Sequence, residues 1–168
     1  MTNRLISILA TIVFILPCTA QTVPPLQAKA LDGSEVNLSN ASAGKPLLLM
    51  IGFSHKSSDD FEGWNKQALA PYWSDSQLAY YELVELQGLP SFVKPMVLHG
   101  MKREIHGTEM SHFVPFYTGE DDWKKIVSYS SSANTYLLLA NSSGHVVWRA
   151  QGTVDAEKIA GLKAALLK

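Results

Sequence analysis

The sequence predicts an α/β sandwich, in which helices flank a central mixed β-sheet. Continuous apolar runs at 46–53 and 135–140 have the length and composition of strands that are buried on both faces. Helical patterns alternate with the apolar runs along the chain. Only four residues, 141–144, separate the last two predicted strands, which is too few for a crossover, so that pair is antiparallel.

The first part of the chain predicts a lead-in and a hairpin. Residues 21–30 contain two consecutive prolines, and we expect a mobile lead-in there. The Asp32-Gly33 turn within 31–38 is followed by alternating apolar residues, which predicts a short hairpin or edge strand. A loop at 43–45 then leads into the buried strand at 46–53.

A helix is predicted directly after the first buried strand. Ser57 and Ser58 are expected to cap its free backbone N–H groups, and the next two residues are acidic, which suits the positive end of a helix dipole. Apolar residues at helical spacing continue to Leu69, and the helix is expected to stop before Pro71.

The rest of the chain supplies three further strands and three helices. In the strand at 78–86 we expect Leu78, Tyr80 and Glu82 on one face, with Ala79, Tyr81 and Leu83 on the other. The segments in order are a helix at 92–105 that tolerates Pro95, a strand at 112–117, a helix from 119 to 129, a strand at 145–151 with Val146 and Trp148 on opposite faces, and an amphipathic helix at 154–167.

The N-terminal twenty residues have the features of a secretory signal peptide. A positively charged start is followed by an apolar run at 5–16 and by small residues that predict cleavage after Ala20. This predicts export to the periplasm or the medium, with residues 21–168 as one domain and 89–115 as a helical insertion. An uncleaved membrane anchor and lipidation at Cys18 are the alternatives.

Composition limits the classes of function. The chain has 168 residues, 46% of them hydrophobic, and a formal net charge of −1, so it lacks the excess of basic residues that nucleic-acid binding requires. Its only cysteine is Cys18, and residues 21–168 contain none. An exported domain of this composition forms no disulfide and depends on packing for its stability.

From about Val23 onward the chain resembles the thioredoxin-like superfamily. The matching pattern is Leu31-Asp-Gly-x-x-Val-x-Leu38 followed by Gly44-Lys-Pro-Leu-Leu-Leu49. Two segments are similar to the mitochondrial ATP synthase F0 assembly-factor family and its bacterial relatives. One is Gly52-Phe-Ser with the following acidic pair and Trp64, and the other is 135–139 with the Trp148-Arg-Ala-x-Gly152 strand. The resemblance implies a thioredoxin-like three-layer sandwich.

Redox thioredoxins carry a C-x-x-C motif and a cis-proline, and this chain lacks both. Without gaps, the two cysteines would fall within a residue or two of His55 and Ser58, so disulfide exchange is chemically impossible. The nearby Asp59 and Asp60 would raise a cysteine pKa, whereas thiol enzymes lower it. Asn134 stands where the resemblance places the cis-proline. The residues therefore favour a domain that has left redox chemistry.

The first hypothesis is a non-enzymatic, exported protein that binds another polypeptide and no cofactor. The resemblance implies an assembly or chaperone role for a membrane complex such as ATP synthase. The face that holds the active site in redox relatives is the expected binding surface, because the end of the first core strand and the start of the late strand are neighbours in this fold. Its residues are Phe53, Ser54, His55, Lys56, Ser58 and Asn134.

Two alternatives are left open. Thioether and imidazole groups suit copper, and they gather in one segment of the insertion, at Met96, His99, Met101, His106, Met110 and His112. Alternatively, His55 acts as a general base that is oriented by Asp59 or Asp60.

Overall fold

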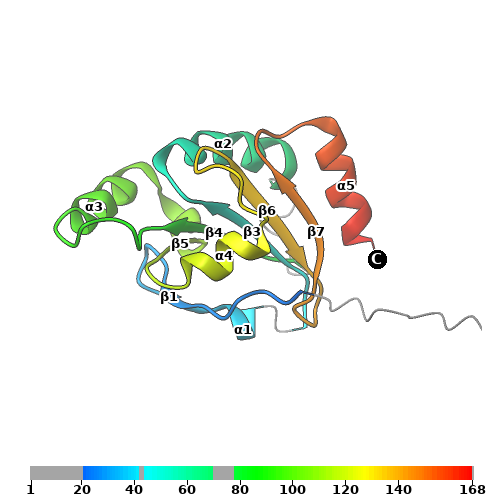
Figure 1. Ribbon diagram of the computed structural model, residues 1–168, viewed down its shortest axis with the longest axis horizontal. Helices are drawn as coiled ribbons and strands as arrows, with labels where there is room; N and C mark the ends of the chain where they lie inside the picture. The colour runs from blue at the N-terminus through cyan, green and yellow to red at the C-terminus, as the bar shows by residue number, and fades with distance from the viewer. Residues whose placement is uncertain (1–20, 42–43, 70–77, 168) are drawn as a thin grey trace, which may run out of the picture.

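A five-stranded mixed sheet forms the middle layer of the molecule (Figure 1). The computed structural model describes residues 21–41, 44–69 and 78–167. The predicted signal peptide, Cys18 and the predicted helix end before Pro71 lie outside these residues.

The sheet has the order β5-β4-β3-β6-β7. Strands β3, β4 and β5 are parallel to one another, whereas β6 is antiparallel to both β3 and β7. The mixed sheet and the antiparallel last pair are therefore confirmed. The bounds are β3 Leu47–Gly52, β4 Ala79–Glu85, β5 Phe113–Phe116, β6 Thr135–Ala140 and β7 Val146–Gln151.

Helices and a β-hairpin cover the two faces of this sheet. One face packs against the hairpin and α4, and the other against α2 and α5, which gives the three layers of the predicted sandwich. None of the helices in the described ranges is both long and apolar enough to cross a bilayer. Their bounds are α1 Leu38–Ala41, α2 Asp59–Trp64 with a π-helical continuation at Asn65–Leu69, α3 Lys94–Glu104, α4 Glu120–Ile126 and α5 Ala156–Leu166.

The central strands bury side chains on both faces, as their continuous apolar sequence predicts. In β3, Leu47, Leu49 and Ile51 belong to one core cluster, and Leu48 and Met50 belong to the other. The faces predicted for β4 are also confirmed: its even-numbered residues share a face with α2, and its odd-numbered residues face the hairpin and α4.

The segment expected to be a mobile lead-in is instead an ordered part of the core. It contains β1 (Gln27–Lys29), which pairs antiparallel with β2 (Glu35–Asn37). Leu26 and Ala30 are buried in the first core cluster, and this burial fixes the segment despite its prolines. The predicted hairpin is confirmed, and its first strand comes from the supposed lead-in.

Strand β7 contains a bulge that settles the orientation of its side chains. Val146 pairs with Ala140 while Trp148 pairs with Leu139, so Val147 has no partner opposite it. A regular strand would put Val146 and Trp148 on one face, but the extra residue moves them to opposite faces. Val146 packs on the first core cluster and Trp148 on the second, as predicted.

The segment 89–115, predicted as a helical insertion, forms α3, a short 3₁₀ helix, η4 (Gly107–Ser111), and the first three residues of the sheet strand β5. Pro95 lies in the first turn of α3, where a missing N–H breaks no helical hydrogen bond. No residue of α3 is fully buried. The helix lies at one edge of the molecule, beyond β5 (Figure 1).

Candidate functional site

The candidate site is the turn that leads from β3 into α2. A single 3₁₀ turn, η1 (His55–Ser58), occupies the position where the resemblance places C-x-x-C. Ser54 is its N-cap: the Ser57 N–H donates to Ser54 Oγ at 3.4 Å, and the Ser54 N–H donates to Ser57 Oγ at 3.3 Å. The N-cap of this turn is thus Ser54, three residues before the predicted cap Ser57, whose hydroxyl completes the capping box. The side chain of Ser58, the other predicted cap, lies outside the described residues.

Two hydrogen bonds fasten this turn to the start of β6. Ser54 Oγ donates to the carbonyl of Ser132 at 2.6 Å, and the hydroxyl of Thr135 donates to the carbonyl of Ser57. Thr135 lies opposite Gly52 in the β3–β6 register. The predicted proximity of the end of the first core strand and the start of the late strand is thus confirmed.

The loop before β6 is itself fixed by a buried phenol. Tyr136 Oη accepts hydrogen bonds from the N–H groups of Ser130 and Ser131, at 2.8 and 2.9 Å, and donates to the carbonyl of Ser131 at 2.9 Å. Burial acts to raise the pKa of Tyr136, but these hydrogen bonds outweigh it and lower the pKa. Asn134 Nδ2 donates to Ser130 Oγ at 3.2 Å, which closes the loop.

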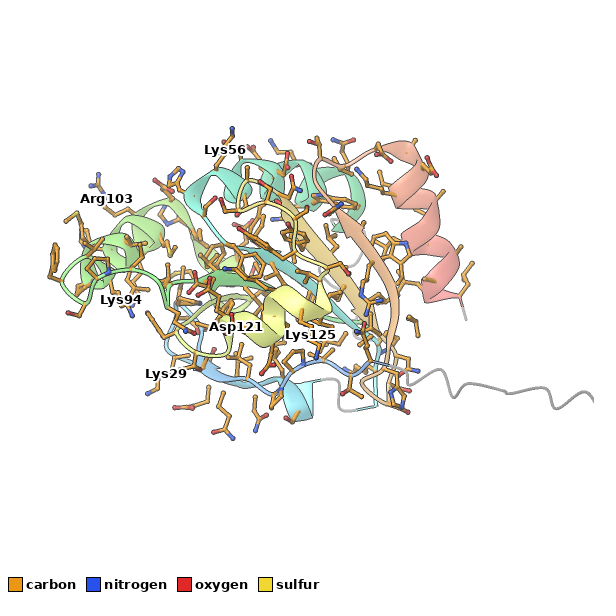
Figure 2. The ribbon with its side chains drawn as sticks, viewed as in Figure 1. Lys29, Lys56, Lys94, Arg103, Asp121 and Lys125 are labelled. Carbon is orange, nitrogen blue, oxygen red and sulfur yellow. The ribbon has the colours of Figure 1, made fainter. Side chains whose placement is uncertain are left out.

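The residues predicted for the site differ in how far they are buried. Phe53 is only 8% exposed and packs edge-on against Tyr129 and Tyr136, so it anchors the start of the turn in the core. His55 and Lys56 are exposed, and Figure 2 shows Lys56 pointing away from the body at the start of α2. Asn134 is half-buried, and the side chain of Ser58 lies outside the described set.

The residues of this site that the sequence analysis did not predict are those that brace the turn: Ser130, Ser131, Ser132, Thr135 and Tyr136. The only local indication is the polar run Ser130-Ser131-Ser132 directly before a buried strand. Their contribution to the site depends on hydrogen bonds that bring the loop onto the β3–α2 turn.

We expect Gly52→Ala to lower the free energy of unfolding by about 2 kcal/mol, measured by urea denaturation. A Cβ at this position would lie 2.6 Å from Ser57 Oγ and 3.1 Å from the ring of Phe61, so the turn must shift. Gly63→Ala in α2 is the control, because its Cβ would meet only Val154 at 3.5 Å, and alanine favours helix. Equal stability of Gly52→Ala and the wild type would show that the turn is not held as described.

A buried carboxyl group lies beneath α2, away from the turn. Glu82 on β4 is 8% exposed, and burial raises its pKa to about 7. Asn65 Nδ2, on the π-helical turn, donates to Glu82 Oε1 at 2.8 Å. Asn65 Oδ1 is buried without a partner. The raised pKa favours the protonated form of Glu82, which can donate a hydrogen bond as well as accept one.

The Met/His segment is spread over different environments. Met101 and Met110 pack against the second core cluster, whereas Met96 is 69% exposed. His112 stacks on Tyr80 with ring centroids 4.0 Å apart, and its Nδ1 lies 3.0 Å from the carbonyl of Tyr80. Within the described ranges, no three His, Cys, Asp or Glu side chains gather as a metal site would require. The copper alternative and the general-base alternative at His55 stay predictions.

Comparison with known proteins gives the fold and leaves the function open. No protein-family model matches the sequence, and no curated protein matches it. The exposed lipoprotein thioredoxin of Streptococcus pneumoniae superposes with a TM-score of 0.56 at 13% identity, over 86% of this chain and 100% of that one. This chain has a thioredoxin-like fold.

Two further solved structures match over most of both chains. A thiol:disulfide interchange protein of the thioredoxin family from Chlorobium tepidum gives a TM-score of 0.55 at 12% identity, over 90% of this chain and 97% of that one. An uncharacterized conserved protein from Geobacillus kaustophilus gives a TM-score of 0.61 at 15% identity, over 88% of this chain and 81% of that one. At these identities the similarity concerns the fold alone.

Proposed function

We propose that this chain is an exported, non-redox thioredoxin-like protein that binds another polypeptide at the β3–α2 turn. Solved structures that share its fold include thiol:disulfide interchange proteins. Residues 21–168 contain no cysteine, so this domain cannot form the mixed disulfide through which such exchange proceeds.

The observation that carries the proposal is the way in which the turn is held. The hydroxyl of Ser54 donates a hydrogen bond to the carbonyl of Ser132, and the hydroxyl of Thr135 donates one to the carbonyl of Ser57. Within the turn, Ser54 and Ser57 form the capping box. His55 and Lys56 are exposed residues on this turn, whose backbone is held by those hydrogen bonds. A surface that is rigid before binding loses little conformational entropy on association, which favours recognition of a partner.

The partner class follows from charge and from the resemblance. Because this chain has no excess of basic residues, it is poorly suited to bind a nucleic acid, and a polypeptide is the better candidate ligand. The similarity of the Gly52-Phe-Ser and Trp148-Arg-Ala segments to the ATP synthase F0 assembly-factor family supports an assembly or chaperone role for a membrane complex. The features of the first twenty residues support export.

Replacing His55 and Lys56 together with alanine tests this function. We expect partner recovery in a pull-down from native cells to fall about tenfold, because both side chains are exposed contacts at the centre of the proposed surface. The melting temperature should stay within about 2 °C of the wild type, since neither side chain is buried. Lys125→Ala on α4 is the matched control, and unchanged recovery for the double variant would contradict the proposal.

A further inference from the structure

We propose a second binding surface, separate from the β3–α2 turn: a cleft beside α3 that takes an extended peptide carrying acidic and bulky apolar side chains. We call it the β1–α3 cleft. Its walls are β1 with its flanks (26–31) and the residues Leu98 and Lys102 of α3, and the end of β5 with the following loop (115–118) completes it.

The size of the β1–α3 cleft suits the side chains of a peptide. Its volume is about 480 Å³, within the range of sites that bind small ligands. Most of the lining is apolar, with Leu26, Leu31 and Leu98 among its residues. The cleft can therefore hold one or two bulky apolar side chains.

Three exposed apolar side chains lie on α3, directly before it or in the lining of the cleft. Phe92 is 79% exposed, Met96 69% and Tyr117 37%, and they are three of the five large hydrophobic residues exposed in the described ranges. Tyr117 also lines the cleft. Aromatic and methionine side chains that stay exposed on a monomer are typical of sites that bury them against a partner.

The charge beside the cleft is positive. Lys29 and Lys102 line it, and Lys94 Nζ lies 5.2 Å from the centre of the Tyr117 ring. Figure 2 shows Lys29 and Lys94 on the same side of the molecule and Arg103 on the other side of α3. Lys29 pairs with Glu35 at 3.3 Å, but both side chains are largely exposed, so this ion pair is weak. An acidic ligand complements these lysines.

Unpaired backbone groups favour a peptide over other acidic ligands. The bonds from Ala30 N to Ser34 O and from Leu38 N to Leu26 O show that even-numbered residues of the β1 segment face β2. The odd-numbered residues therefore face the opposite side, where the Leu31 N–H donates to the carbonyl of Phe113 on β5. Among the described residues, the backbone groups of Gln27 and Lys29 on that side have no partner, so they are available to an extended chain.

The concave shape argues against a lipid bilayer as the ligand. A flat membrane would reach Phe92 and Met96, but it could not enter a cleft that is walled by β1 and α3. Binding to a lipid bilayer is therefore the competing outcome of the test. A peptide can use all three features at once: the apolar cleft, the lysines and the free backbone groups.

The test uses a fluorescein-labelled dodecapeptide in which glutamate alternates with phenylalanine and valine. Binding to the domain (residues 21–168) is followed by fluorescence anisotropy, and the contact surface is mapped by amide chemical shifts of the ¹⁵N-labelled protein. We expect shifts to concentrate at 26–31, 98–102 and 115–118. Lys102→Glu should weaken binding about tenfold, because it replaces an attractive charge with a repulsive one.

Arg103→Glu is the matched control: it makes the same change in charge one residue further along α3, outside the cleft lining, and should weaken binding less than twofold. The peptide with lysine in place of glutamate should not bind. Equal weakening by both variants, or shifts confined to His55 and Lys56, would overturn the proposal. So would binding to vesicles of phosphatidylcholine and phosphatidylglycerol without binding to the acidic peptide.

Discussion

Trp64→Phe is expected to lower the free energy of unfolding by about 3 kcal/mol. Trp64 is fully buried on α2, and its Nε1–H donates to the carbonyl of Gly152, at the end of β7, at 2.9 Å. Phenylalanine fills only part of the space and leaves this part-buried carbonyl without its donor. Urea denaturation followed by far-ultraviolet circular dichroism measures the loss.

Trp148→Phe is the matched control for this prediction. Trp148 is half-buried on β7, where it packs beside Gly161 of α5. Among the described residues its indole N–H has no hydrogen-bond partner, so its replacement removes packing alone. We expect a loss of about 1 kcal/mol. Equal losses for the two variants would mean that the bond to Gly152 contributes nothing to stability.

Glu82→Gln is expected to raise the free energy of unfolding at pH 8 by about 3 kcal/mol. At that pH Glu82 is ionised in the folded protein although the residue is only 8% exposed, and burying this charge costs stability. Glutamine carries no charge, so it avoids the cost. Glutamine can still accept from Asn65 Nδ2, and its own amide N–H can donate to Asn65 Oδ1, which has no partner in the wild type.

The sign of the pH dependence follows from the raised pKa of Glu82, about 7 in the folded state against 4.5 ordinarily. Below pH 4.5 the group is protonated in both states, and its burial carries no charge penalty. Between pH 4.5 and 7 the unfolded chain releases the proton while the folded protein keeps it, so stability falls as pH rises. Above pH 7 the group is ionised in both states, so the loss of stability is complete and no longer changes with pH.

Unfolding free energies at pH 4.5, 6 and 8 test this account. The difference between Glu82→Gln and the wild type should grow with pH over this range. Glu104→Gln, at the exposed end of α3, is the control and should track the wild type. A difference that does not change with pH would show that Glu82 is already ionised in the folded protein at pH 4.5.

The central strands could be predicted from sequence because both of their faces are buried. The apolar runs at 46–53 and 135–140 are continuous, as expected for strands that are buried on both faces, and β6 has the predicted bounds. β1 could not be predicted with the same certainty, because two prolines closely precede it and disfavour a strand. The alternation of Leu26, Ala28 and Ala30 is the one local feature that indicates a strand there.

The turn that carries the predicted site could be located from the sequence, but its contacts could not. Overlaying the C-x-x-C motif places the site at His55–Ser58, where η1 lies. The bond from Ser54 to Ser132 joins residues 78 apart in the sequence, and no local pattern reveals it. The contact of Glu82 with Asn65 likewise arises only when α2 packs on β4. Tertiary contacts therefore decide which of the predicted residues support the turn and which stay exposed to solvent.

Site-specific photo-cross-linking tests the central claim most directly. The photoreactive residue p-benzoylphenylalanine replaces Lys56 on the turn or, as the control, the exposed Lys125 on α4, and cross-linked products from native cells are identified by mass spectrometry. The account predicts a discrete polypeptide captured from position 56 and absent from position 125. Capture of the same products from both positions, or of none from position 56, would contradict the claim that the thiol-free turn is a polypeptide-binding surface.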